Sequence, residues 1–102
     1  MQEVQNNGMI QKNLYITLQG DIDLGNADAF YGAVMEAYTA TPADIVFQCE
    51  NLNFIDSTTL GTFVKILKML KMDGKTMRLQ GLQAKIKKLF VICALDSVIQ
   101  ID

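Results

Sequence analysis

The chain has 102 residues, of which half are hydrophobic and a fifth are charged. This length and composition are typical of one globular core and exclude a disordered chain, so we treat residues 1–102 as a single domain. The sequence has no histidine and no tryptophan. Histidine is the commonest general base and metal ligand, so we expect no enzymatic activity, no metal and no cofactor.

The two cysteines and the N-terminal segment indicate the cellular compartment. Cys49 and Cys93 each lie within an apolar run, where a free cysteine usually acts as a small core residue. The sequence leaves a disulfide open, but two cysteines without a signal peptide favour a reducing compartment. The first eight residues have neither a basic nor a long apolar segment, and no apolar run is long enough to cross a bilayer. We therefore expect a cytoplasmic protein that does not insert into membranes.

The net charge of −2 conceals an uneven distribution. Residues 1–50 carry one basic and seven acidic side chains, whereas residues 51–102 carry eight basic and four acidic ones. This difference arises either by chance between helix faces or from a two-signed surface that steers a protein partner. Few aromatic residues lie near the lysines, so we expect no nucleic-acid partner. Two groups are interpreted as solvated helix faces rather than phosphate sites: Lys65, Lys68 and Lys71, and Lys85, Lys87 and Lys88.

The first half of the chain predicts a strand pair, a helix and a central strand. Residues 14–20 alternate large apolar and smaller or polar residues and form a strand. Residues 3–11 are its partner, with the turn at residues 12–13 preferred over Asn7-Gly8. Asn26 is typical of a helix N-cap, and apolar residues follow it at helical spacing. Residues 43–49 form a strand that is apolar on both faces, as in a central strand covered by helices.

The second half alternates helices and strands. A long helix begins near Asp56, ends at Asp73-Gly74 and is followed by a strand at residues 77–81. A short helix at residues 84–90 and a last strand at residues 98–101 complete the order β-β-α-β-α-β-α-β. The fold class is therefore α/β, with a mixed four- to five-stranded sheet covered by helices and right-handed crossovers.

Two polar segments follow the ends of predicted strands and are the candidate functional site. Asp56, Ser57, Thr58 and Thr59 open the long helix, where capping alone would explain them. However, an exposed helix N-terminus also receives phosphate well. The turn at residues 20–26 follows another strand, and in a parallel sheet the two segments meet at one edge. We expect this edge, after the predicted loop at residues 50–53, to bind a ligand or a partner.

The turn Gly20-Asp21-Ile22-Asp23 and the stretch Phe54-Ile55-Asp56-Ser57-Thr58 are similar to those of anti-sigma-factor antagonists of the STAS family. The resemblance covers nearly the whole chain, because the order of elements also agrees. It implies a bacterial partner-switching regulator of transcription that binds an anti-sigma factor, itself a serine kinase, and is inactivated by phosphorylation. It places the phosphate on Ser57, with Thr58 as the less favoured acceptor. The implied partner-binding residues are Asp21, Asp23, Asn26, Asp56, Ser57, Thr58, Thr59 and Gly61.

Two departures from the family pattern leave alternatives open. The family usually has glycine at the position of Thr59, and a bulkier β-branched residue there is expected to hinder a docking kinase. A non-phosphorylated STAS subunit of a signalling scaffold or transporter complex is therefore one alternative, and a small-ligand or nucleotide sensor is another. The family also continues into a final helix, whereas this chain stops at Asp102. We therefore expect apolar surface near Phe90 and residues 98–101, covered by a partner or by a second copy in a homodimer.

Overall fold

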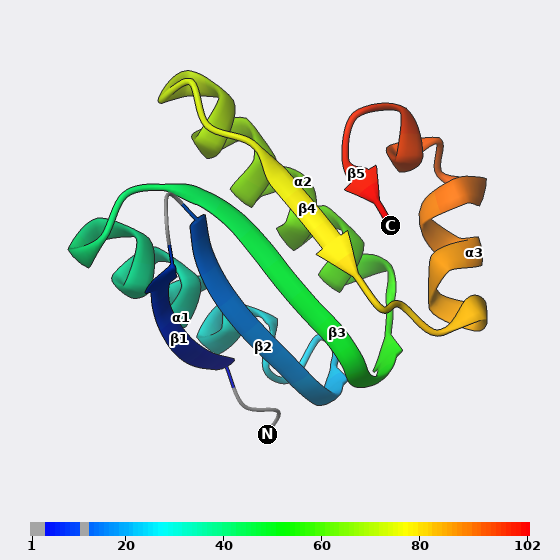
Figure 1. Ribbon diagram of the computed structural model, residues 1–102. Helices are drawn as coiled ribbons and strands as arrows, with labels where there is room; N and C mark the ends of the chain where they lie inside the picture. Colours follow the sequence, from blue (N-terminus) through cyan, green and yellow to red (C-terminus); the bar gives the residue numbers. More distant parts are fainter. Residues whose placement is uncertain (1–3, 11–12) are drawn as a thin grey trace.

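The computed structural model describes residues 4–10 and 13–102, with side chains described from Asn13 onward. Five strands form one sheet in the order β1-β2-β3-β4-β5, with β1 antiparallel to β2 and every other pair parallel (Figure 1). The strands are β1 (Val4–Ile10), β2 (Asn13–Ile22), β3 (Asp44–Ile55), β4 (Met77–Gln80) and β5 (Gln100–Ile101). The helices are α1 (Ala27–Ala40), α2 (Ser57–Met72), α3 (Ala84–Ile92) and a short 3-10 turn, η1 (Leu95–Ser97). The predicted order of elements and the mixed sheet are confirmed.

The antiparallel pairing of β1 with β2 extends to Ile10 and Asn13, which are paired across the two strands. The preferred turn included residue 12, which lies outside the described residues. The competing turn at Asn7-Gly8 is wrong, because these residues lie within β1 at a register shift between Asn6 and Met9. A β-bulge, rather than a turn, therefore accounts for the Asn-Gly pair.

The two strands next to the candidate site are longer than predicted. β2 continues to Ile22 and β3 to Ile55, so the segment at residues 50–53 is strand and not loop. Gly20 has a φ of +76° and lies at an irregularity in the β2–β3 register, which explains why it resembled the end of a strand. In β3, only Leu52 and Ile55 are buried after Cys49. Buried and exposed side chains therefore no longer alternate along this part of the strand. The segments that follow these two strands therefore begin after Ile22 and after Ile55, later in the chain than predicted.

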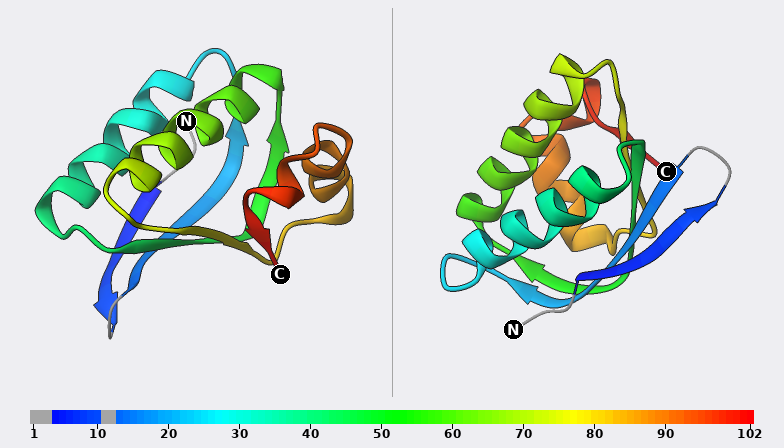
Figure 2. Two further views of the ribbon diagram at one scale, coloured as in Figure 1. Left: turned by 90° about the horizontal axis from the view of Figure 1, so that it is seen from above. Right: turned by 90° about the vertical axis from the view of Figure 1, so that its left-hand side faces the viewer.

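All three helices lie on one face of the sheet (Figure 2), so helices cover the central strand β3, as expected, but on that face alone. Val46 is nearly inaccessible on the open face, where it is flanked in register by Tyr15 and Arg78. On the covered face, Phe63 of α2 packs against three other phenylalanine rings, with centroids 5.2–5.5 Å away. These partners come from α1, β3 and α3: Phe30, Phe47 and Phe90. The aromatic cluster joins all three helices to the sheet.

The C-terminal region differs from prediction in what it buries. Phe90 and Ile99 are buried, so the apolar surface expected at these two residues is wrong. β5 contains only Gln100 and Ile101, and Val98 precedes it with its side chain exposed. Of the two cysteines, Cys49 is buried as expected, but Cys93 at the end of α3 is exposed, and both are free. The homodimer stays a prediction.

Candidate functional site

The candidate site lies where β2 and β3 end (Figure 1). These strands are parallel neighbours, and their last residues, Ile22 and Ile55, are paired. The loop before α1 and the start of α2 therefore emerge from the same edge of the sheet. The expectation that the two polar segments share one edge is confirmed.

Asp56 joins the two segments. It is the N-cap of α2, and its Oδ1 accepts a hydrogen bond from the backbone N–H of Thr59 (3.0 Å). Its Oδ2 accepts a second bond from the N–H of Leu24 (2.9 Å), 32 residues earlier in the chain. Donation by the Thr59 N–H is the main reason why the pKa of Asp56 lies below its ordinary value. The carboxylate thus caps a helix and anchors the neighbouring loop.

Thr59 has a different position from the one expected. Its side chain is completely buried in the free chain, so it neither reaches the surface expected to bind a partner nor adds bulk to that surface. Its Oγ1 lies 2.6 Å from the carbonyl oxygen of Ile22 and 2.9 Å from Oδ1 of Asp56. A hydroxyl carries one proton and donates to one of these acceptors at a time. Thr59 therefore reinforces the link between the end of β2 and the start of α2.

The loop from Asp21 to Asn26 holds its shape through its own hydrogen bonds. Asn26 occupies the N-cap position of α1, as predicted, but its side chain does not cap the helix. Instead, its Oδ1 accepts from the Asp23 N–H (2.8 Å) and its Nδ2 donates to the Asp21 carbonyl oxygen (2.9 Å). The Asp23 carboxylate accepts from the Gly25 N–H (2.9 Å). Side chains near both ends of the turn, those of Asp23 and Asn26, therefore hydrogen-bond to its backbone.

The other expected site residues lie at the surface. Ser57, Thr58 and Gly61 are exposed on the first turns of α2, and Asp21 is exposed at the end of β2. Within the described part of the chain, the Ser57 and Thr58 hydroxyls have no hydrogen-bond partner, in contrast to that of Thr59. Ser57 therefore presents a free hydroxyl directly after the capping carboxylate.

Two apolar residues at this edge were missed by sequence reasoning. Leu24 at the tip of the loop is 76% exposed, and Phe54 near the end of β3 is 48% exposed. Leu24 gave a signal, because it is a large apolar residue between the turn-forming residues Asp23 and Gly25. Phe54 gave none, since a phenylalanine is most often buried and nothing in the neighbouring sequence indicates otherwise. The edge is thus apolar as well as acidic.

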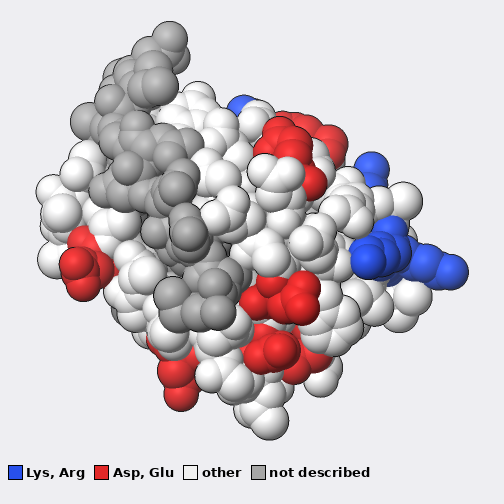
Figure 3. Space-filling model, turned by 90° about the horizontal axis from the view of Figure 1, so that it is seen from below, with Lys and Arg blue, Asp and Glu red and all other residues white. Residues whose placement is uncertain are grey.

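Charge is separated on this side of the molecule. Figure 3 looks onto this edge and shows acidic side chains gathered near its centre and a group of basic ones along one border.

No cluster of three or more potential metal ligands exists among the described residues. In the same part of the chain, no helix is long and apolar enough to span a membrane.

Comparison with known proteins identifies the family. The model of the STAS domain matches residues 2–102. An anti-sigma-B factor antagonist of Bacillus subtilis (strain 168) is 28% identical over 92 residues, which cover 90% of this chain and 84% of that protein. The anti-sigma-B factor antagonist of Staphylococcus aureus (strain NCTC 8325 / PS 47) is 30% identical over 99 residues, covering 80% of this chain and 92% of that protein. The chain belongs to the STAS domain family, and the resemblance drawn from the sequence is confirmed.

Solved structures support the same fold. The anti-sigma factor antagonist SpoIIAA in its unphosphorylated form gives a TM-score of 0.70 at 19% identity, covering 94% of this chain and 97% of that chain. The phosphorylated form of SpoIIAA, a Bacillus cell fate determinant, gives 0.75 at 18% identity, covering 98% of this chain and 91% of that chain. A Thermotoga maritima protein gives 0.85 at 20% identity, covering 98% of this chain and 84% of that chain. At these identities the likeness concerns the fold alone.

Proposed function

We propose that this chain is an anti-sigma-factor antagonist, a cytoplasmic, non-enzymatic regulator that binds an anti-sigma factor with serine-kinase activity. The docking surface is the edge formed by residues 21–26 and the first two turns of α2. Phosphorylation of Ser57 by that partner switches binding off. The observation that carries the proposal is the free, exposed Ser57 hydroxyl beside the Asp56 carboxylate, on a surface that hydrogen bonds hold together.

In the phosphoryl transfer, this chain supplies only the acceptor hydroxyl of Ser57. The partner supplies ATP, magnesium and a general base, the Ser57 oxygen attacks the γ-phosphorus, and ADP leaves. The partner's base takes the hydroxyl proton. Ser57 is preferred over Thr58 because the resemblance to the family places the phosphate on the residue directly after the aspartate.

A phosphate at Ser57 would act through charge. It adds about −1.5 to −2 charges at neutral pH, close to Asp56 and to the acidic loop at Asp21 and Asp23. The N-terminus of α2 tolerates an anion, so the fold should persist. A partner surface that fits the unmodified edge instead meets extra charge and bulk. Release of the partner is therefore the expected result.

The test is a binding titration with an anti-sigma factor of the serine-kinase type from the organism that encodes this chain. Ser57→Asp should weaken binding at least tenfold while the melting temperature stays within about 2 °C of wild type, since exposed substitutions change stability little. Ser97→Asp is the control for added charge, because it places the same charge on an exposed serine away from this edge and should bind as wild type does; its melting temperature is measured too, since the Ser97 hydroxyl donates to the Ala94 carbonyl oxygen (2.7 Å). If Ser57→Asp binds the partner as tightly as the unmodified chain, the proposed switch is wrong. That result would favour the non-phosphorylated STAS subunit instead.

A further inference from the structure

Two large apolar side chains near Asp56, those of Leu24 and Phe54, are exposed in the free chain. Leu24 is attached through its backbone N–H to the Asp56 carboxylate, and its side chain is 76% exposed. Phe54 lies two residues before Asp56, is paired in register with Asp21 and is 48% exposed. Both therefore border the start of α2, one from the loop and one from the strand.

The loop holds the backbone of Leu24 in a fixed place. Its N–H is bound by Asp56, and hydrogen bonds of Asp23 and Asn26 close the turn around it. Met72 provides a contrast, because it is even more exposed at 88% but is the last residue of a helix. A side chain carried on a preorganised backbone loses less conformational entropy on binding than one on a free end. This loop therefore presents Leu24 in the way expected of a binding contact.

Phe54 borders an apolar groove between β3 and α3. The groove has a volume of about 200 Å³, and its lining includes Ile86 and Leu89 of α3 together with Lys85. Beside it, Gln83 Nε2 donates to Asn53 Oδ1 (3.2 Å) and ties the start of α3 to β3. The groove lies next to the start of α2 and extends the surface away from the acidic loop.

We infer that Leu24 and Phe54 are the apolar contacts of the docking surface. This inference rests on the proposed function and adds the chemistry of the partner. Leu24 inserts into an apolar depression that basic side chains border, because the acidic Asp21 and Asp23 lie next to it on the loop. An apolar side chain of the same partner occupies the groove at Phe54. The apolar contacts slow dissociation, and the acidic residues speed association.

The experiment compares three neutral substitutions in the full chain, with the same anti-sigma factor as probe. Leu24→Ser and Phe54→Ser should each weaken binding about tenfold or more, mainly through faster dissociation. Met72→Ser is the control, since it removes an even more exposed apolar side chain from the far end of α2, and its affinity should stay within twofold of wild type. The melting temperature of Leu24→Ser should equal that of wild type, which separates a binding effect from unfolding.

The outcomes distinguish this inference from the proposed function. Wild-type affinity for Leu24→Ser, together with weakened binding for Ser57→Asp, would overturn the apolar contact and leave the phosphorylation switch intact. Equal weakening by Met72→Ser would also overturn it, because any loss of exposed apolar surface would then suffice. If Leu24→Ser and Ser57→Asp both bind as wild type does, the inference and the proposed function fall together.

Discussion

The link between the two halves of the site depends on a few atoms. One carboxylate, that of Asp56, accepts from two backbone N–H groups: that of Leu24, 32 residues earlier in the chain, and that of Thr59, near the start of α2. The Thr59 hydroxyl adds a contact to the end of β2. A glycine, which the family usually has at this position, has no hydroxyl to offer. The Thr59 side chain therefore adds a link between the end of β2 and the start of α2 and stays buried while doing so.

Acidification should loosen this link. The pKa of Asp56 is lowered in the folded chain, chiefly by the Thr59 N–H, so its stabilising effect is present above the ordinary carboxyl pKa and is lost as the pH falls through the lowered value. Asp56→Asn retains an acceptor but does not titrate. The wild type should be the more stable protein at pH 7, and thermal melts should show the difference narrowing as the pH is lowered to about 3. A difference that stays constant with pH would contradict the assigned role of this carboxylate.

The sequence predicted that Asp56 caps a helix, but it did not predict which of the neighbouring side chains are buried and which are exposed. An aspartate before three hydroxyl residues predicts a helix cap, and Asp56 is one. The burial of Thr59 depends on Ile22, which a neighbouring strand brings within hydrogen-bond distance. Cys93 lies in an apolar run yet is exposed, because α3 buries only Ile86 and Phe90. Local patterns do not report such tertiary neighbours.

At the level of elements, periodicity predicted which segments are helices and strands, while the strand ends near the site were missed. Gly20 and the polar residues after Cys49 resemble turns, although both lie within strands. At these positions the ladder between β2 and β3 shifts its register, so the side chains no longer alternate in the pattern that sequence reading requires. The missed segments are the ones that carry the site.

The packing of α2 fixes where Ser57 lies, and Phe63 is central to it. The Phe63 ring contacts rings from α1, β3 and α3 and is fully buried. Phe63→Ala should lower the free energy of unfolding by about 3–5 kcal/mol, a large part of the ~5–15 kcal/mol typical of a small domain. Urea titration followed by circular dichroism measures this loss. Phe54→Ala is the control and should cost clearly less, since its ring is half exposed; equal losses would show that the aromatic cluster is not the core of the fold.

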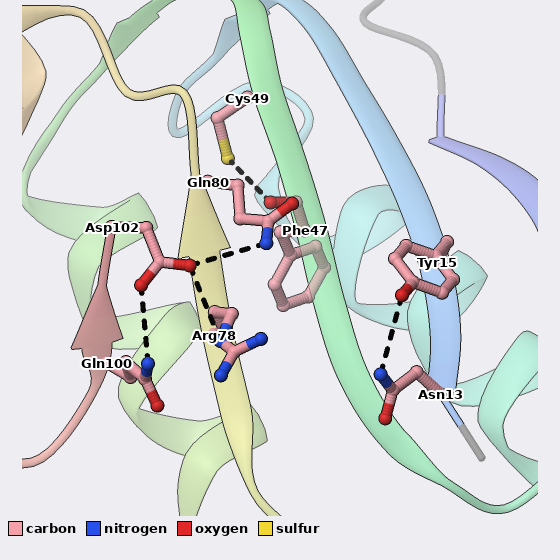
Figure 4. A network of polar contacts seen from close by, with 8 residues as sticks. All are labelled: Asn13, Tyr15, Phe47, Cys49, Arg78, Gln80, Gln100 and Asp102. Atoms are coloured by element: carbon pink, nitrogen blue, oxygen red, sulfur yellow. Dashed lines mark hydrogen bonds and ion pairs between the residues drawn. The ribbon is translucent and has the colours of Figure 1, made fainter. Parts of the chain in front are cut away.

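Considered as a whole, the molecule has faces of different character. The open face of the sheet is polar, and Asp102 lies among Arg78, Gln80 and Gln100, at 3.4 Å from Arg78 Nε and 3.3 Å from each amide nitrogen (Figure 4). The opposite face is covered by helices. The edge at the ends of β2 and β3 differs from both, because it combines a free hydroxyl, exposed acidic residues and exposed apolar side chains. This combination makes it the surface best suited to a regulated protein partner.

Transfer of phosphate from ATP tests this account most directly. The chain is incubated with the same anti-sigma factor as in the binding titration, in the presence of ATP and magnesium, and phosphate is located by mass spectrometry of the peptides. We expect one phosphate, on Ser57, no phosphate on Ser57→Ala, and normal transfer to Thr58→Ala. A complex that forms but transfers no phosphate, or a Ser57→Ala protein that is phosphorylated as efficiently as wild type, would contradict it.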